Sequence, residues 1–110
     1  MKKTKLGNTE FQISSIGLGA WAMGGGGWTF GWGPQDDSES IAAIHRALDL
    51  GINWIDTAAI YGLGRSEQVV GRALAEVPSS KRPLVFTKCS LVWDEQGRIS
   101  HNLEPASLRK

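Results

Sequence analysis

Residues 53–62 have the sequence NWIDTAAIYG, and this stretch decides how the rest of the chain is interpreted. The apolar run at residues 52–55 directly follows Gly51, a residue type that commonly ends helices. A short apolar run in that position predicts a buried parallel strand, with Asp56 at its carboxyl end. Tyr61 comes five residues after this aspartate, within reach of a short loop.

A second run, LVFT at residues 84–87, predicts another strand. It contains β-branched and aromatic side chains, follows a proline and stops at Lys88. Strands that alternate with helices lie parallel, so their carboxyl ends point to the same rim of the sheet. We therefore expect Asp56 and Lys88 to meet on one rim, close to Tyr61.

The types of these three side chains suit the reduction of a carbonyl group. A tyrosine hydroxyl holds its proton at neutral pH and gives it up reluctantly. A lysine cation beside it stabilises the phenolate and makes the phenol a better general acid. A buried lysine needs an anionic partner to keep its own charge, and Asp56 can be that partner. The phenol can then protonate a carbonyl oxygen while a hydride arrives from a cofactor.

This order of residues resembles the aldo-keto reductase family. The pattern D-T-A-x-x-Y-G stands at residues 56–62, followed by SE at residues 66–67 and by TK at residues 87–88. The resemblance runs from Leu6 to the last residue and implies an α/β fold, the (β/α)8 TIM barrel. It also implies NADPH (NADP) as cofactor and an aldehyde or ketone as small-molecule substrate. Such a barrel needs about 250 residues, so we expect these 110 residues to hold about three of the eight units.

The resemblance assigns roles to single side chains. The family's catalytic tetrad consists of an aspartate, a tyrosine, a lysine and a histidine, and Asp56, Tyr61 and Lys88 match the first three. The tetrad histidine ends the fourth barrel strand, and we expect this chain to stop before that strand. His101 is a candidate replacement, but a histidine on a predicted loop lacks the fixed geometry that acid–base chemistry needs.

The resemblance also places part of the cofactor site. The nicotinamide end is expected near Gly19, Ala20, Trp21 and Asp56, whereas the family's main cofactor contacts come from later strands. No metal site is predicted.

An alternative cofactor motif overlaps the first of these residues. GLGAWA at residues 17–22 fits G-x-G-x-x-A, the dinucleotide fingerprint of the Rossmann fold. That fingerprint must open a helix, yet four consecutive glycines at residues 24–27 come next, and each glycine costs about 1 kcal/mol in a helix relative to alanine. The sequence therefore favours a strand followed by a loop.

One domain is expected over residues 1–110, as a partial barrel. Residues 1–15 are predicted to form a β-hairpin at the bottom of the barrel, because the turn-rich tetrad at residues 7–10 separates two alternating runs. Residues 16–110 are predicted to form the first three β/α units, with the first strand at residues 16–19.

Two helices are predicted between these strands. The tetrad DDSE at residues 36–39 supplies a capping residue and first-turn negative charge, and apolar residues at near-helical spacing follow, which predicts a capped helix that ends at Gly51. Ser66 is predicted to cap the next helix, whose apolar stripe should face the core. His45 lies inside the first helix, away from the expected rim. Pro105 predicts the start of a third helix.

Two segments are predicted as loops on the catalytic rim. The first, AMGGGGWTFGWGP at residues 22–34, shows no regular period and predicts a long mobile loop that carries Trp28, Phe30 and Trp32. These rings either line a substrate pocket or pack on helices and other parts of a barrel. The second loop is expected at residues 90–104. The tryptophans in both loops hint at an apolar or ring-bearing carbonyl substrate.

Composition excludes several other classes. Hydrophobic residues make up 41% of the chain and charged residues 21%, values ordinary for a globular segment. The net charge of +1 argues against nucleic acid and against an anionic membrane as partner. No signal peptide or transmembrane run is recognisable, so we expect a cytoplasmic protein.

Cys89, the single cysteine, cannot form an internal disulfide, and a small strand-end residue is favoured over a reactive thiol.

Two further functions stay open beside the reductase. The family also includes potassium-channel β subunits, which keep the fold and bind cofactor while they regulate a partner. The chain can also be an inactive truncation. Three strands alone would leave unpaired edges and an apolar face uncovered, which predicts self-association or dependence on a missing C-terminal part, and little turnover by these 110 residues alone.

Overall fold

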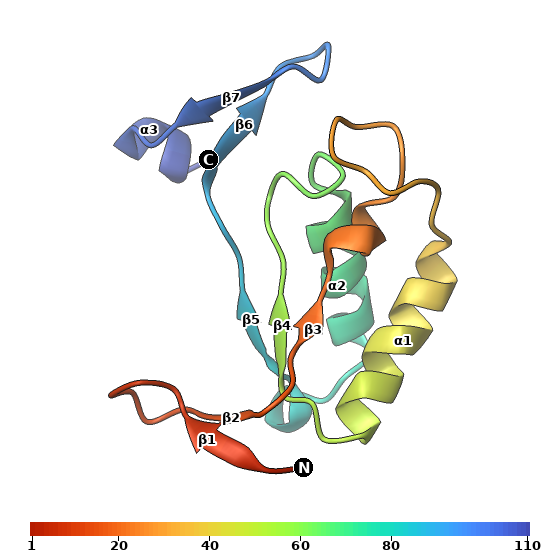
Figure 1. The fold of residues 1–110 in the computed structure, drawn as a ribbon, viewed down its shortest axis with the longest axis vertical. Coiled ribbons are helices and arrows are strands. Elements are labelled where there is room, and N and C mark those ends of the chain that lie inside the picture. Colours follow the sequence, from red (N-terminus) through yellow and green to blue (C-terminus); the bar gives the residue numbers. More distant parts are fainter.

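Three short parallel strands form the centre of the fold, in the order β3-β4-β5 (Figure 1). The structure is a computed structural model that describes residues 1–110. The register pairs Gly19 with Asp56, and Asp56 with Phe86, so the carboxyl ends of the strands are level on one rim. The strands are Leu18–Gly19 (β3), Trp54–Asp56 (β4) and Leu84–Phe86 (β5). All three predicted strands are confirmed.

Two helices cover one face of this sheet, as Figure 1 shows. Helix α1 spans Asp37–Asp49 and α2 spans Arg65–Ala75. The predicted cap of α1 is confirmed, because the Asp36 carboxylate accepts a hydrogen bond of 3.0 Å from the Glu39 amide. The core between helices and sheet contains Ile44, Ile55 and Ala73, each with no exposed surface.

The longest helix has 13 residues, and none has the length and apolar character that a membrane crossing requires.

The start of α2 differs from the prediction. Gly64 is the N-cap, with a φ of 96° that favours glycine, and no side chain caps the helix. Ser66 instead lies fully buried in the first turn. Its hydroxyl donates to the Ala20 carbonyl at 2.8 Å and lies 2.9 Å from the Thr57 hydroxyl. The predicted Ser66 cap is therefore wrong, because this hydroxyl links the ends of β3 and β4 to the helix.

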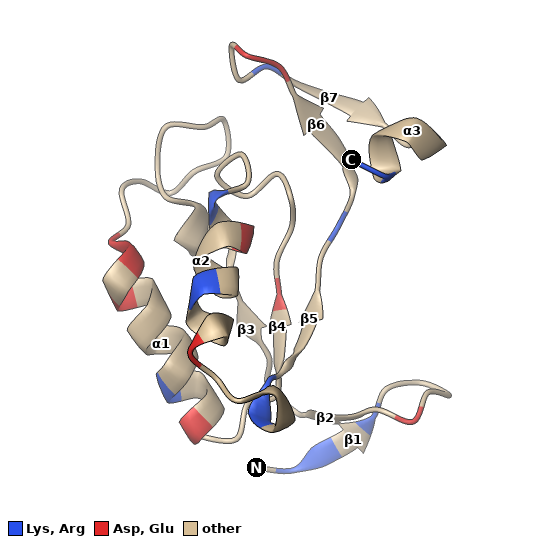
Figure 2. Cartoon of the chain, turned by 180° about the vertical axis from the view of Figure 1, so that it is seen from behind, with Lys and Arg blue, Asp and Glu red and all other residues tan.

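The predicted N-terminal hairpin is confirmed. Strands Lys3–Lys5 (β1) and Gln12–Ser14 (β2) pair antiparallel, and the blue ribbon in Figure 2 marks β1 as basic. The hairpin lies across the amino end of the sheet (Figure 1). The Asn53 side chain accepts a hydrogen bond of 2.8 Å from the Ser14 amide, and the Trp54 indole donates to the Ser14 carbonyl at 2.9 Å. Two residues of the opening stretch thus hold the hairpin in place.

Residues 90–104 form a hairpin rather than the predicted loop. Strands Ser90–Trp93 (β6) and Ile99–Asn102 (β7) pair antiparallel, and the short helix Pro105–Leu108 (α3) follows. The Asp94 carboxylate makes the turn, because it accepts hydrogen bonds of 2.9 Å from the amides of Gln96 and Arg98. This local turn chemistry pairs strands that carry no clear alternating pattern.

The β6–β7 hairpin stands apart from the sheet in Figure 1. The radius of gyration is 14.9 Å, above the roughly 13 Å of a compact domain of this length. The difference agrees with two projecting hairpins. Two short 3-10 helices complete the chain: Trp21–Gly24 (η1) and Ser79–Lys81 (η2).

Candidate active site

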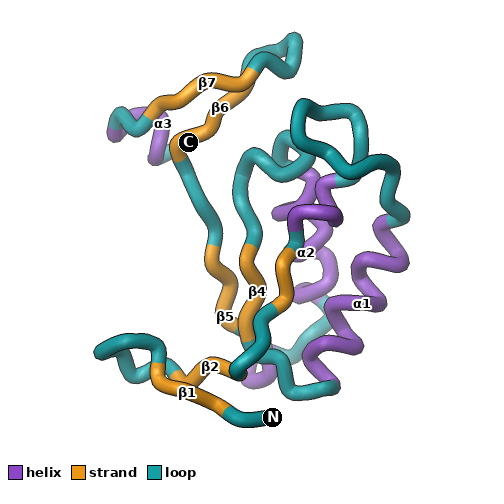
Figure 3. The backbone as a smooth tube through the Cα atoms, viewed as in Figure 1, coloured by secondary structure: helices purple, strands orange, loops and turns teal.

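The connections that leave β3, β4 and β5 all lie at one end of the sheet (Figure 3). Asp56 is the last residue of β4, Tyr61 lies in the turn between β4 and α2, and Lys88 follows the end of β5. The structure brings these three predicted residues together on the expected rim. Their distances define a candidate active site.

The Lys88 ammonium is the centre of this group. It donates to both carboxylate oxygens of Asp56, at 3.0 and 2.8 Å, and to the Thr57 carbonyl at 2.9 Å. It also donates to the Tyr61 hydroxyl oxygen at 3.2 Å. An ammonium has three protons, so one each for the carboxylate, the carbonyl and the phenol uses them all. The Tyr61 proton is therefore free to point outward.

The surroundings keep Lys88 charged. Partial removal from water lowers the pKa of Lys88, but the hydrogen bonds to Asp56 and Tyr61 and the charge of Asp56 outweigh this effect. The net pKa of Lys88 is raised above its ordinary value. Because the Lys88 and Asp56 side chains are 51% and 41% exposed, solvent screens this pair, and its main effect is to place the cation.

Tryptophans surround the Tyr61 ring. Trp21 stacks on it, with ring centroids 5.7 Å apart and an angle of 9° between the planes. Trp32 also stacks on Trp21, with ring centroids 5.6 Å apart, and Trp28 lies tilted against Tyr61 at 6.3 Å. The rings of the predicted rim loop thus pack on Tyr61 and Trp21, which favours a pocket wall over packing on the helices.

Close backbone packing brings this loop to Tyr61. Gly24 and Gly62 approach so closely that a Cβ added to Gly62 would lie 2.1 Å from the Gly24 carbonyl oxygen. The φ of Gly62 is also positive, at 65°, which favours glycine. Only glycine fits here, so the turn that carries Tyr61 and the end of η1 form one packed unit.

The residues predicted to lie near the cofactor have different surroundings. Gly19 is exposed beside Asp56, with nothing within 4 Å of where a Cβ would be, and Trp21 is 40% exposed. Open space next to Asp56 can accept a flat ring such as a nicotinamide. Ala20 is fully buried among core residues, so its side chain faces the helices rather than this space.

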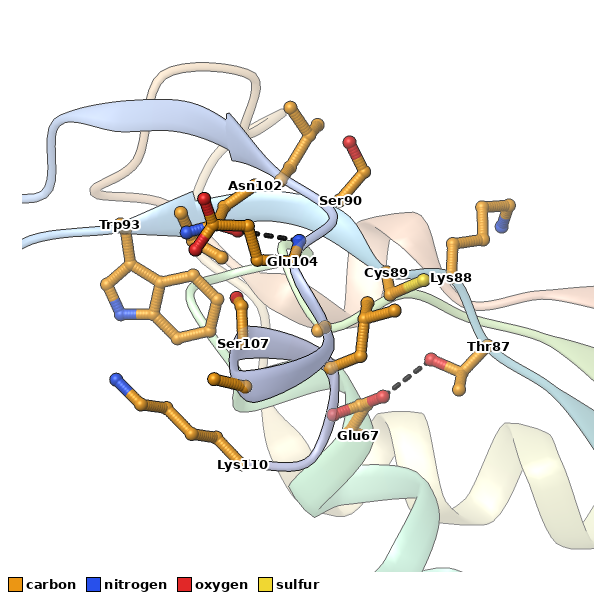
Figure 4. A pocket seen from close by; sticks show the side chains of 15 residues that line it. Glu67, Thr87, Lys88, Cys89, Ser90, Trp93, Asn102, Glu104, Ser107 and Lys110 are labelled. Atoms are coloured by element: carbon orange, nitrogen blue, oxygen red, sulfur yellow. Dashed lines mark hydrogen bonds between the residues drawn. The ribbon is translucent and has the colours of Figure 1, made fainter.

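A groove opens beside the site, between the β6–β7 hairpin, α3 and the start of α2 (Figure 4). In this view Lys88 points away from the groove, whereas Glu67 and Thr87 point toward each other and share a hydrogen bond. Cys89 is exposed and lines the groove as a free thiol.

The two histidines lie outside the hydrogen-bonded group. His101 is on β7, where its Nδ1 lies 3.2 Å from the Ser90 hydroxyl. His45 on α1 lies 2.9 Å from the Ala73 carbonyl of α2, so it joins the two helices. No hydrogen bond connects either imidazole with Asp56, Tyr61 or Lys88.

Sequence reasoning missed two contributors to the site. The Thr57 carbonyl binds Lys88, and only the placement of Thr57 inside the opening stretch could have pointed to it. Arg65 binds the Gln35 carbonyl and the Asp37 carboxylate. Its place in a glycine-bearing connection gave no signal, because its partners lie 30 and 28 residues earlier.

Comparison with known proteins decides the family. The model of the "Aldo/keto reductase family" matches residues 15–110. The chain belongs to the aldo/keto reductase family. Members of this family are oxidoreductases that use nicotinamide cofactors, and the match covers all the rim residues described above.

Several relatives of this aldo/keto reductase chain have names. An Escherichia coli protein named "NADH-specific methylglyoxal reductase" is 41% identical over all of this chain and 36% of its own length. "Aldo-keto reductase YhdN" of Bacillus subtilis is 42% identical over 92% of this chain and 29% of its own length. The chain thus spans about a third of the length of the curated relatives it matches.

Solved structures agree with the fold. The glycerol dehydrogenase AKR11B4 from Gluconobacter oxydans matches with a TM-score of 0.78 and 42% identity, over 97% of this chain and 32% of that one. The holo form of aldo-keto reductase AKR11C1 from Bacillus halodurans matches with a TM-score of 0.77 and 28% identity, over 99% and 33%. The predicted fold class, part of a TIM barrel, is confirmed.

Proposed function

We propose that this rim is the proton-donating half of the active site of a nicotinamide-dependent reductase that converts aldehydes or ketones to alcohols. One observation carries the proposal: a single ammonium, that of Lys88, donates to both the Asp56 carboxylate and the Tyr61 hydroxyl oxygen. Residues 1–110 are proposed to be one partial barrel domain, with the hairpin at residues 1–15 below the site.

Tyr61 is the proposed general acid. Its oxygen accepts a hydrogen bond from Lys88, so its own proton is available to a carbonyl oxygen. As the carbonyl carbon gains a hydride, negative charge develops on that oxygen and is relieved by the Tyr61 proton. The phenolate that remains lies 3.2 Å from the Lys88 cation, which stabilises it. Asp56 holds Lys88 in place and balances its charge.

The cofactor, when bound, supplies the hydride. The open space at Gly19, between Asp56 and Trp21, is the proposed place for its nicotinamide end. Family resemblance implies NADPH, whereas the name of the Escherichia coli relative specifies NADH. We propose NADPH as the cofactor and make NADH the comparison in the assay.

Two classes of carbonyl compound are proposed as probes. Methylglyoxal comes from the name of the Escherichia coli relative. A ring-bearing aldehyde such as benzaldehyde follows from the tryptophans around Tyr61, since aromatic rings pack well on flat substrates. The aromatic aldehyde is expected to be the better substrate.

The test compares wild type with Tyr61→Phe in the intact protein as its cells produce it. The oxidation of NADPH and of NADH is followed with each aldehyde. Loss of the phenol proton should lower kcat by about a hundredfold or more, while cofactor binding, measured by fluorescence titration, stays within about twofold. The stacking of the ring on Trp21 survives this change, so folding should be unaffected.

His101→Asn is the matched control, because His101 lies on the same rim but outside the hydrogen-bonded group. Its kcat should match that of wild type. A fall as large as that of Tyr61→Phe would mean that His101 takes part in catalysis. Turnover that persists in Tyr61→Phe contradicts the proposal, and tight cofactor binding without any turnover in wild type would favour a regulatory binding protein.

A further inference from the structure

Arg65 connects the two ends of the loop that carries Trp28 and Trp32, which we call the aromatic loop, residues 25–36. Near the end of this loop, one guanidinium nitrogen of Arg65 donates to the Gln35 carbonyl at 2.6 Å and to Asp37 at 2.7 Å. A second nitrogen donates to the same Asp37 oxygen at 3.1 Å. These are charge-assisted bonds in a planar fork, which lysine cannot reproduce.

The same guanidinium also touches the beginning of the loop. A Cβ added to Gly25 would lie 2.1 Å from the third nitrogen of Arg65, so the side chain packs directly on the Gly25 backbone. Gly25 itself is buried, although it belongs to a rim loop. Arg65 therefore joins the first residue of the aromatic loop to the end of the loop at Gln35 and to the start of α1 at Asp37.

The position of this loop decides what lies against the proposed proton donor. Trp28 contacts the Tyr61 ring, and the Trp21 indole donates to the Phe30 carbonyl at 2.9 Å. Trp21 in turn stacks on Tyr61. If the loop opened, the Tyr61 ring would lose Trp28 and Trp21 would lose its hydrogen bond.

We propose that Arg65 is a positioning residue that holds the aromatic loop closed over Tyr61 and thereby sets the affinity for ring-bearing carbonyl substrates. The kinetic part of this proposal rests on the proposed reductase function. The loop-closing part stands on the contacts of Arg65 alone, so the two can fail separately.

Arg72 provides a matched control. It donates to the other oxygen of Asp37 at 3.2 Å, but it binds no residue of the aromatic loop. Its side chain is 61% exposed, against 36% for Arg65. Arg72→Met thus removes one cation from the same carboxylate and leaves the loop contacts in place.

The first measurement is amide hydrogen exchange in the intact protein, which needs no activity. Exchange within residues 25–36 should rise by about tenfold in Arg65→Met, while Arg72→Met matches wild type. Arg65→Lys should lie between them, because lysine keeps the charge and loses the fork. Equal exchange in Arg65→Met and Arg72→Met, whether both high or both unchanged, would overturn the loop-closing role.

The second measurement separates positioning from folding. In Arg65→Met, KM for benzaldehyde should rise by roughly tenfold, KM for the small methylglyoxal by less, and the melting temperature should equal that of Arg72→Met. An unchanged KM for benzaldehyde in a variant with a loosened loop would overturn the specificity role. If wild type reduces neither aldehyde, the proposed function fails, and the exchange result still decides whether Arg65 closes the loop.

Discussion

The aromatic loop and the β6–β7 hairpin leave the same sheet at the same rim, yet different forces hold them. The aromatic loop is tied by distant partners, through Arg65 to Gln35 and through the packing of Gly24 on Gly62. The hairpin is held mainly by its own hydrogen bonds, since those of residues 90–102 all stay within residues 90–104. Figure 3 shows the loop above the helices and the hairpin apart from the sheet.

This difference separates two kinds of rim segment. A segment held by tertiary bonds to the turn of Tyr61 changes when that turn changes, and it can therefore adjust catalysis. A segment whose hydrogen bonds are all internal, and which meets that turn only through side-chain packing of Trp93 on Gly64 and of Leu63 on Gly97, should respond to it far less. Substitutions in the aromatic loop or at its partners should therefore change kcat or KM. Substitutions in the hairpin should change only its local stability.

The largest effect is expected at Lys88, where the chain passes from the sheet to the hairpin. Its bonds run to Asp56, Thr57 and Tyr61, and none runs to the hairpin. Lys88→Met should lower kcat/KM by about a hundredfold or more, since the phenolate loses its cation. Hydrogen exchange in the hairpin should be unchanged. A loosened hairpin in this variant would mean that site and hairpin are coupled.

The pH profile checks the same residue. Because the folded pKa of Lys88 is raised, its cation and the bonds it makes are present at neutral pH and are lost only as pH rises through that raised value. Wild type should therefore keep this contribution up to at least about pH 10.5. Direct titration of the Lys88 ammonium by NMR separates its ionisation from that of Tyr61, and a pKa of Lys88 below about 10.5 would contradict the raised value.

The next effect concerns two buried serines that make a matched pair. Ser66 links Ala20, at the root of the aromatic loop, to Thr57, whereas the buried Ser40 hydroxyl has no partner. Ser66→Ala should lower the free energy of unfolding by about 1–3 kcal/mol, because it leaves buried polar groups unpaired. Ser40→Ala should be neutral or slightly stabilising. Urea unfolding of both variants measures the difference, and equal losses would mean that side-chain packing, not hydrogen bonding, sets the cost.

The smallest effect is expected in the turn of the hairpin. Hydrogen bonds from the Arg98 amide and guanidinium lower the pKa of Asp94. Their stabilisation is present above the unfolded pKa of about 3.9 and is lost as pH falls through the lowered folded value. Protection factors of residues 90–102, which correct for the fall of intrinsic amide exchange with pH, should therefore decrease on acidification. Asp94→Asn should raise exchange by about twofold at neutral pH, remove this pH dependence and leave kcat unchanged. A change in kcat in Asp94→Asn would contradict the claim that the hairpin, unlike the aromatic loop, has no influence on catalysis.

Much of the fold could be predicted because it follows local patterns. The two apolar runs that end at Asp56 and Lys88 became strands, and parallel topology then placed both residues on one rim. A cap for α1 followed from the tetrad at residues 36–39 before a helical pattern, and the structure shows that Asp36 is the capping residue. Ser66 was predicted wrongly because a serine at a helix start looks the same whether it caps the helix or binds a distant carbonyl.

The hairpin was missed for another reason. Its strands lack a clean alternation, and the turn depends on one carboxylate that accepts from two amides and a guanidinium. The residue types did carry a turn signal, Asp94 followed three residues later by Gly97, but the prediction did not use it. The aromatic loop was predicted to be mobile from its composition alone. Whether its rings line a pocket or pack elsewhere was left open.

The sequence by itself determined the order of the three sheet strands and of helices α1 and α2, the family, and the identity of the three polar residues at the rim, because these depend on spacing and residue type along the chain. Only the tertiary structure decided which hydroxyl, carbonyl and guanidinium support that rim. Ser66, Thr57 and Arg65 bind partners up to 46 residues away. Such pairings arise when the strand ends and helix α2 pack together, and no local pattern encodes them.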